Sequence, residues 1–140
     1  MEKKCIILEG GIFVDDRGVL RFVNSFDFNG IKRFYQVGNH ERGFIRAWHG
    51  HKKEEKYVYV AKGTAWIGVI DMETEEVEKF VLSDKNPKIL HIPTGKYNGF
   101  QTLEEDTQII FFTTSTVEET KGDDIREPYE KFPIFRKEYR

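Results

Sequence analysis

Two histidines, His49 and His51, stand two residues apart in the segment 46–63, whose pattern otherwise indicates a strand. Successive side chains of a strand point to opposite faces, so the two imidazoles are predicted to project the same way. Ile45 and Ala47 precede them on the same predicted face. Two imidazoles beside apolar neighbours can act as an acid and a base, can bind a metal ion, or can be polar groups satisfied by hydrogen bonds.

A His-x-His pair is a common start of a metal site, and the cupin metal motif continues it with a Glu and, later, a further His. Here Lys56 stands at the position of that Glu, and Asn98 stands at the position of the last His. Glu55 is next to Lys56, but a strand turns its side chain to the opposite face. Only two good ligands remain, whereas a stable site needs about three or four, so no bound metal is expected.

The same segment supplies the groups that proton transfer beside a carbonyl requires: two imidazoles and a cationic side chain. Neutral imidazole has a pKa of about 6.5 and can take up and return protons at neutral pH. Removal of a proton next to a ketone creates an enolate, whose oxygen needs a positive or hydrogen-bonding partner. Lys56 shares strand parity with Val58 and Val60, and it points into the mouth of a barrel if those valines line the interior. The alternative is that one histidine is structural and that Lys56 is solvated at a strand end.

The composition is that of an ordinary single-domain chain. It has 140 residues, of which 39% are hydrophobic and 33% charged, and its 12 phenylalanines favour a sheet over a helix bundle. A net charge of −2 gives no general attraction to nucleic acid, and the apolar runs are too short to cross a membrane. The single cysteine, Cys5, excludes an internal disulfide and is typical of a cytoplasmic protein.

Turn signals divide residues 3–114 into about eleven short strands, and no segment has a sustained helical period. Many short strands separated by turns predict an all-β sandwich or barrel. The segment 44–51 is one of these strands, and 107–114 is apolar on both faces, which indicates a central strand. Residues 118–140 are interpreted as a C-terminal tail on the barrel rim, within a single domain of residues 1–140.

Several motifs resemble, in their shared order, those of cupins that isomerise or epimerise nucleotide-linked 4-keto-6-deoxy sugars, over about residues 10–132. The motifs similar to the dTDP-4-dehydrorhamnose 3,5-epimerases are Asp16-Arg17-Gly18, Phe44-Ile-Arg46-Ala-Trp-His49, Leu82-Ser-Asp-Lys-Asn86 and Ile92-Pro-Thr-Gly95 through Phe100. The motifs similar to the dTDP-4-oxo-6-deoxyglucose 3,4-ketoisomerases are Ile31-Lys-Arg33-x-Tyr35, Arg46-x-x-His49-x-His51-Lys52-Lys53 and Asp124-Ile-Arg126-Glu-x-Tyr129-x-x-Phe132. The short chain and the His-x-His-Lys sequence favour the ketoisomerase branch.

The resemblance implies a double-stranded β-helix (a cupin jelly roll) that acts as a homodimeric isomerase without a cofactor. It implies that His49 is the catalytic base and that His51 takes part as a proton moves from C3 to C4 of the sugar through an enediol. Lys56 is similar to the epimerase lysine near the keto oxygen, and Asp124 lies near the position of the Asp that pairs with the epimerase histidine. The substrate-binding residues expected at the mouth are Arg17, Arg33, Tyr35, Gln36, Arg46 and Asn98.

The chain departs from these families in ways that shape the expectations. The epimerase tyrosine that acts on the opposite face of the sugar has no counterpart in the stretch 111–117, which argues against double epimerisation. Arg46 lies three residues from His49, so it reaches the same site only through a β-bulge or by contacting a different part of the substrate. The alternative is that Arg46 is a surface or dimer-interface arginine. Strand parity allows only one of Tyr35 and Gln36 at the mouth.

The sequence therefore predicts a cytoplasmic 3,4-ketoisomerase of a nucleotide-diphospho-4-keto-6-deoxyhexose in deoxysugar or polysaccharide biosynthesis, and the expected nucleotide is dTDP. The open alternatives are an epimerase at C3 or at both C3 and C5, a sugar-nucleotide-binding cupin without catalysis, and a metal cupin. Neither a nucleic acid nor a membrane is an expected partner. Ala47 stands where the family has a Gly, and Trp48 where it has a small or aliphatic residue, and these changes predict a narrower or differently shaped site.

Overall fold

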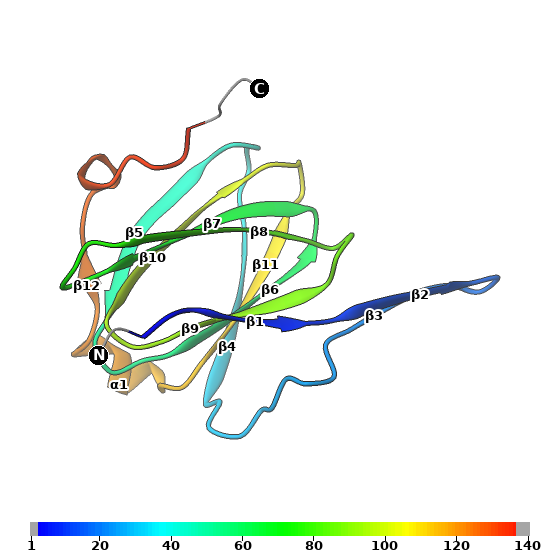
Figure 1. The fold of residues 1–140 in the computed structure, drawn as a ribbon, viewed down its shortest axis with the longest axis horizontal. Coiled ribbons are helices and arrows are strands. Elements are labelled where there is room, and N and C mark those ends of the chain that lie inside the picture. The colour runs from blue at the N-terminus through cyan, green and yellow to red at the C-terminus, as the bar shows by residue number, and fades with distance from the viewer. Residues whose placement is uncertain (1–2, 137–140) are drawn as a thin grey trace.

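The computed structural model describes residues 3–136 and consists mainly of antiparallel strands, which confirms the predicted all-β class (Figure 1). The strands are β1 (Ile6–Glu9), β2 (Gly11–Asp15), β3 (Gly18–Phe22), β4 (Arg33–Gly38), β5 (Ile45–His51), β6 (Lys56–Lys62), β7 (Thr64–Asp71), β8 (Val77–Ser83), β9 (Lys88–Ile92), β10 (Lys96–Thr102), β11 (Gln108–Thr113) and β12 (Ile125–Arg126). The helical elements are α1 (Val117–Lys121) and the 3-10 turn η1 (Tyr129–Lys131). Neither is long or apolar enough to cross a membrane, a finding limited to residues 3–136.

Two five-stranded sheets pack face to face, in the strand orders β1-β9-β6-β11-β4 and β12-β5-β10-β7-β8. The chain passes from one sheet to the other at most connections, for example from β4 to β5, from β5 to β6 and from β6 to β7. Strands that alternate in this way between two antiparallel sheets form a jelly roll, the predicted fold.

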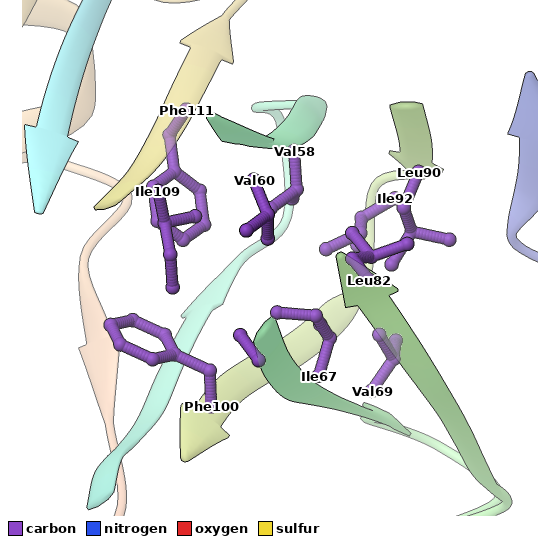
Figure 2. Packing of buried hydrophobic residues seen from close by; sticks show 11 residues of the cluster. Val58, Val60, Ile67, Val69, Leu82, Leu90, Ile92, Phe100, Ile109 and Phe111 are labelled. Carbon is purple, nitrogen blue, oxygen red and sulfur yellow. The ribbon is translucent and has the colours of Figure 1, made fainter. Parts of the chain in front are cut away.

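The interior between the sheets follows the two-residue alternation of the strands. In β6 the side chains of Lys56, Val58 and Val60 are buried, and the residues between them are half-buried. Val58 is in register with Phe111 of β11 and with Leu90 of β9. Figure 2 shows this apolar layer facing the side chains of β7 and β10. Because Lys56 has the parity of the two valines, its side chain also points between the sheets, as predicted.

A second apolar cluster covers the outer face of the sheet that contains β5, β10 and β7. Trp48, Ile70 and Phe135 are buried in it, and the rings of Trp48 and Phe135 stack with centroids 5.7 Å apart. The chain reaches this face after β12, which pairs with β5. Of the segment expected as a tail, 118–140, the residues that pack on this sheet face are Tyr129, Phe132, Ile134 and Phe135. Residues 1–2 and 137–140, which the expected domain of residues 1–140 includes, lie outside the described residues.

Strands β2 and β3 form a separate hairpin that projects from the barrel (Figure 1). Gly18 closes its turn with a φ of 145°, a conformation that favours glycine. The apolar residues of this hairpin are 44–65% exposed: Ile12, Phe13, Val14, Val19 and Leu20. The core of the barrel therefore does not account for the apolar character of the hairpin.

Candidate active site

An extra residue in β5 brings three functional side chains to one face. β10 pairs Asn98 with His49 and Phe100 with Arg46, so two steps along β10 match three steps along β5. This β-bulge reverses the parity of β5 before His49, and Arg46 faces the interior together with His49 and His51. The bulge that the sequence required for Arg46 is present.

The bulge also corrects two expectations. Ile45 and Ala47 pack against the outer cluster, so the prediction that they share a face with the histidines was wrong. Trp48 is 1% exposed and stacks on Phe135 in that outer cluster, so the prediction that it narrows the site was wrong as well. Strand parity alone does not reveal where an extra residue is inserted, and each side chain on one side of the insertion changes face.

His51 is 7% exposed, and both of its ring nitrogens face polar groups. Nδ1 lies 2.7 Å from the backbone oxygen of Asp123, which can only accept, so Nδ1 carries a proton and donates it. The carboxylate of Asp123 accepts hydrogen bonds from the backbone N–H groups of residues 52–54 at 2.8, 2.9 and 3.1 Å, which fixes the turn into β6. Burial and the charge of Lys56 lower the pKa of His51, while Glu54 opposes them.

Glu54 is a buried carboxylate that the sequence did not single out. Its side chain is 0% exposed, and its Oε2 lies 3.3 Å from His51 Nε2 and 3.9 Å from Lys56 Nζ. Its Oε1 lies 3.9 Å from a terminal nitrogen of Arg33. Neither carboxylate oxygen has a hydrogen-bond partner in the described part of the chain. The site therefore contains a buried acid with cationic and imidazole neighbours.

Lys56 is 6% exposed and lies against two aromatic rings. Its Nζ donates to the hydroxyl of Tyr35 at 3.0 Å and lies 5.7 and 5.5 Å from the ring centroids of Tyr35 and Phe111. Burial lowers the pKa of Lys56 to about 8, although Glu54 opposes this shift. Burial also raises the pKa of Tyr35, so at neutral pH an ammonium group lies beside a phenol that keeps its proton.

His49 is half-buried, and its backbone oxygen accepts a hydrogen bond from Asn98 Nδ2 at 3.1 Å. Burial and the charges of Lys56 and Arg126 lower the pKa of His49, so its ring is neutral at neutral pH. Asp124 lines the same site, opposes that shift, and accepts a hydrogen bond from Arg126 Nε at 3.1 Å. A neutral imidazole in this position can act as a general base.

These groups line one cavity of about 390 Å³. All but two of the predicted site residues line this cavity. Those that line it are His49, His51, Lys56, Asp124, Arg33, Tyr35, Arg46 and Asn98. Three guanidinium groups and the ammonium of Lys56 make its walls positive, whereas Phe100 and Phe111 make part of its lining apolar. Across residues 3–136, no three His, Cys, Asp or Glu side chains gather as a metal site requires.

The two exceptions are Arg17 and Gln36. Gln36 alternates with Tyr35 along β4, is exposed, and donates to Gln108 at 2.9 Å, so parity selects Tyr35 for the cavity. Arg17 lies at the tip of the β2–β3 hairpin, where its side chain is 84% exposed and pairs with Asp15 at 2.6 Å. Figure 1 shows this tip far from the body of the barrel.

Other cavity residues were missed by the sequence reasoning. Arg126 belongs to the motif at 124–132, and the pairing of β12 with β5 brings it to the cavity. Phe100 and Phe111, predicted as core residues, belong to the core and also line the cavity. Glu54, which contacts the cavity residues His51 and Lys56 but does not line the cavity, had one usable signal, because it follows His51 by three residues across a charged turn where the chain enters β6.

Residues 3–132 match the family model described as dTDP-4-dehydrorhamnose 3,5-epimerase. This protein belongs to that family. This protein is 28% identical over 124 residues to the spore coat polysaccharide biosynthesis protein SpsL of Bacillus subtilis. The alignment covers 83% of this chain and 82% of SpsL.

Two solved structures share the fold of this family member. The dTDP-4-dehydrorhamnose 3,5-epimerase of Bacillus anthracis has a TM-score of 0.79 at 20% identity, covering 94% of this chain and 83% of the other. The WlaRB TDP-quinovose 3,4-ketoisomerase of Campylobacter jejuni has a TM-score of 0.70 at 24% identity, covering 94% and 98%. The family membership and these structures confirm the cupin jelly roll, and the fold is common to both enzyme branches.

Proposed function

We propose that this protein is a 3,4-ketoisomerase of a nucleotide-diphospho-4-keto-6-deoxyhexose. The observation that carries the proposal is the shared cavity of His49 and His51, beside the buried ammonium of Lys56. Ketoisomerisation moves one proton between two carbons and another between two oxygens, and two neighbouring imidazoles suit these two tasks.

His49 is the base in this proposal. It accepts the proton from C3, and the electron pair of the C3–H bond forms the C3=C4 bond of an enediol while O4 gains negative charge. The Lys56 ammonium and the Tyr35 hydroxyl, 3.0 Å apart, stabilise that charge. His49 then returns the proton to C4, and His51 carries the second proton between the oxygens. No cofactor takes part, because the carbonyl of the substrate itself accepts the electron pair.

The positive wall of the cavity supports a diphosphate-linked substrate. Arg33, Arg46 and Arg126 line it from three different strands, and guanidinium groups bind phosphate oxygens with paired hydrogen bonds. Arg46 is held by Asn39, whose Oδ1 accepts from its Nε at 2.7 Å. Asn98 also lines the cavity and donates a hydrogen bond to the backbone oxygen of His49.

A dTDP-linked sugar is the proposed form of the substrate. The Bacillus anthracis epimerase was solved with TDP and pyrophosphate bound, and the QdtA 3,4-ketoisomerase of Thermoanaerobacterium thermosaccharolyticum was solved with TDP. The name of SpsL supports a role in polysaccharide biosynthesis. The unpaired Cys5 is in keeping with the proposed cytoplasmic location.

We prefer ketoisomerisation to epimerisation because of the cavity lining. The stretch 111–117 supplies Phe111 to the cavity and has no tyrosine that could protonate the opposite face of the sugar. Tyr35 lines the cavity from the sheet opposite the histidines, but its hydroxyl accepts a hydrogen bond from Lys56 Nζ. An epimerase at C3 or C5 is the second candidate, favoured by the family model that the chain matches.

The protein is also proposed to be a homodimer. The exposed apolar hairpin supports this, because a surface of this kind is normally covered by a partner. Arg17 is remote from the cavity of its own chain, so its proposed role in binding the diphosphate requires the hairpin of one copy to reach the cavity of the other. Arg17→Ala should then weaken substrate binding roughly tenfold, and sedimentation of the wild-type protein as a monomer would contradict the dimer.

The proposed reaction is tested by incubating the protein with freshly made dTDP-4-keto-6-deoxyglucose in deuterated water. NMR should detect a 3-keto product, and His49→Asn should abolish its formation. Deuterium at C3 or C5 with the 4-keto group retained would instead identify an epimerase. A substrate that binds and stays unchanged, with no solvent deuterium at any carbon, would identify a binding protein.

A further inference from the structure

Each ring nitrogen of His51 has one polar neighbour. Nδ1 lies 2.7 Å from the backbone oxygen of Asp123, so the proton of a neutral ring is on Nδ1. Nε2 then presents a lone pair, and the nearest acidic atom is Glu54 Oε2 at 3.3 Å. A lone pair that faces a carboxylate oxygen in a buried site is repelled, unless one proton lies between the two atoms.

No group other than His51 comes within hydrogen-bond distance of the Glu54 carboxylate in the described part of the chain. Its side chain is fully buried, and neither oxygen has a hydrogen-bond partner. Lys56 Nζ and a terminal nitrogen of Arg33 both lie 3.9 Å away, beyond hydrogen-bond distance. The charge of Lys56 opposes the protonation of His51, whereas that of Glu54 favours it.

We propose that Glu54 and His51 share a single proton, and that Glu54 is the positioning residue that keeps His51 able both to give and to take a proton. This inference rests on the proposed ketoisomerase function for its catalytic part. The His51 Nε2–Glu54 Oε2 contact of 3.3 Å is not a formed hydrogen bond in the free protein, and poorly aligned contacts of this kind are common for catalytic groups before the substrate binds.

The shared proton completes the balance of the reaction. As His49 removes the proton from C3, the O4 atom gains an electron pair and takes the proton of the His51–Glu54 pair from His51 Nε2, which gives the enediol. In the second half, the O3–H bond breaks and its proton returns to Nε2, the C3=O bond forms, and C4 takes the proton held by His49. Each group ends in its starting state, so no oxidant, reductant or further acid is needed.

The groups that face this pair come from four elements. Arg33 lies on β4, His49 on β5 and Lys56 on β6, and Asp123 and Asp124 precede β12. The control for a Glu54 substitution must therefore be a substitution of a nearby carboxylate that does not contact His51. Glu55 offers that control, because its side chain turns away to His91, whose Nε2 lies 2.7 Å from Glu55 Oε1.

The first test is ¹⁵N NMR of the imidazole rings in the free protein, without substrate. Glu54→Gln should lower the pH at which the His51 ring titrates by about one unit or more, and Glu55→Gln should leave it unchanged. Nδ1 of His51 should be protonated throughout. An equal titration in the wild-type protein and in Glu54→Gln, or a proton absent from Nδ1, would overturn the proposal whatever the enzyme does.

The second test is kinetic. Glu54→Gln should lower kcat about 100-fold with KM changed by less than about threefold, while Glu54→Asp should recover part of kcat and keep the titration of His51. Glu54→Asp also covers the case in which the glutamine variant does not fold. A kcat of Glu54→Gln close to that of Glu55→Gln would overturn the proposal. Failure of the ketoisomerase function itself would appear separately, as absence of product from the wild-type protein with the ring titration intact.

Discussion

The space between the two sheets has two sides of opposite character. Around β8 and β9 it is filled by apolar side chains such as Leu82 and Leu90, which are 2% and 0% exposed. Around β4 and β5 the same space holds the cavity, with His51 and Lys56 buried at its wall. Both sides are built from antiparallel strands, so the difference lies in a few side chains and in the β-bulge that turns Arg46 inward.

Strand β6 joins the two sides. Its inward residues run from Lys56 through Val58 to Val60, that is, from the cavity into the core. The apolar neighbours of Lys56 desolvate its ammonium, and this burial lowers its pKa to about 8. The electrostatics of the cavity therefore depend on the packed side, whereas the stability of the packed side need not depend on the cavity.

The largest expected effect is the loss of activity when a residue of the cavity side is replaced. His49→Asn should lower turnover about 1000-fold, because the base is lost, and should change the denaturation midpoint little, because the side chain is half-buried. His91→Asn, outside the cavity, is the control. Deuterium incorporation measured by NMR checks both variants, and a His49→Asn rate within tenfold of the wild type would break the assignment.

The converse substitution affects stability. Leu90→Ala should lower the free energy of unfolding by about 2–5 kcal/mol, because it leaves a hole in a fully buried cluster. The remaining folded protein should turn over substrate at nearly the wild-type rate. Urea denaturation followed by fluorescence gives the first quantity, and a kcat measured well below the midpoint gives the second. A large fall in kcat would show that the two sides are coupled.

The ionisation of Lys56 should make both the stability and the turnover of the protein depend on pH. Its pKa of about 8 in the folded protein lies below the ordinary value of 10.5. Between these values the unfolded chain holds the proton that the folded chain has released, so this group makes stability rise with pH. Turnover should fall over the same range, roughly tenfold per pH unit, because a neutral amine stabilises the oxyanion less.

Lys56→Met is the reference for that measurement. Subtracting its unfolding free energy from that of the wild type, from about pH 7 to about pH 10, isolates the contribution of Lys56. Burial raises the pKa of Tyr35, so its ionisation in the unfolded chain lowers stability above its ordinary pKa of 10 and sets the upper limit of the window. A difference that stays flat over this range would mean that Lys56 is not desolvated.

The smallest expected effect compares two neighbours on β4. Tyr35→Phe removes the hydroxyl that accepts the hydrogen bond from Lys56 and should lower turnover about tenfold. Gln36→Ala, on the outward face, should leave turnover within about twofold. Steady-state kinetics of both variants test which face of β4 contributes to turnover. An equal fall in turnover would mean that the side-chain direction along β4 does not decide function.

Local pattern in the sequence was enough for the strands and for part of the site. The predicted strand 44–51 is β5 (Ile45–His51), and the shared face of His49 and His51 follows from their spacing. The inward direction of Lys56 follows from the valines that share its parity. These features depend on neighbours a few residues apart, because the period of a strand is fixed by the backbone.

Only the tertiary structure decided the rest. The bulge that turns Arg46 inward depends on the pairing of β5 with β10, and the burial of Glu54 depends on Arg33 from β4 and on the turn fixed by Asp123. Arg17 ended on an isolated hairpin, which no local pattern excluded. Such features arise from contacts between segments distant in the sequence, and the composition of a single segment carries no information about which partner will desolvate or pair with it.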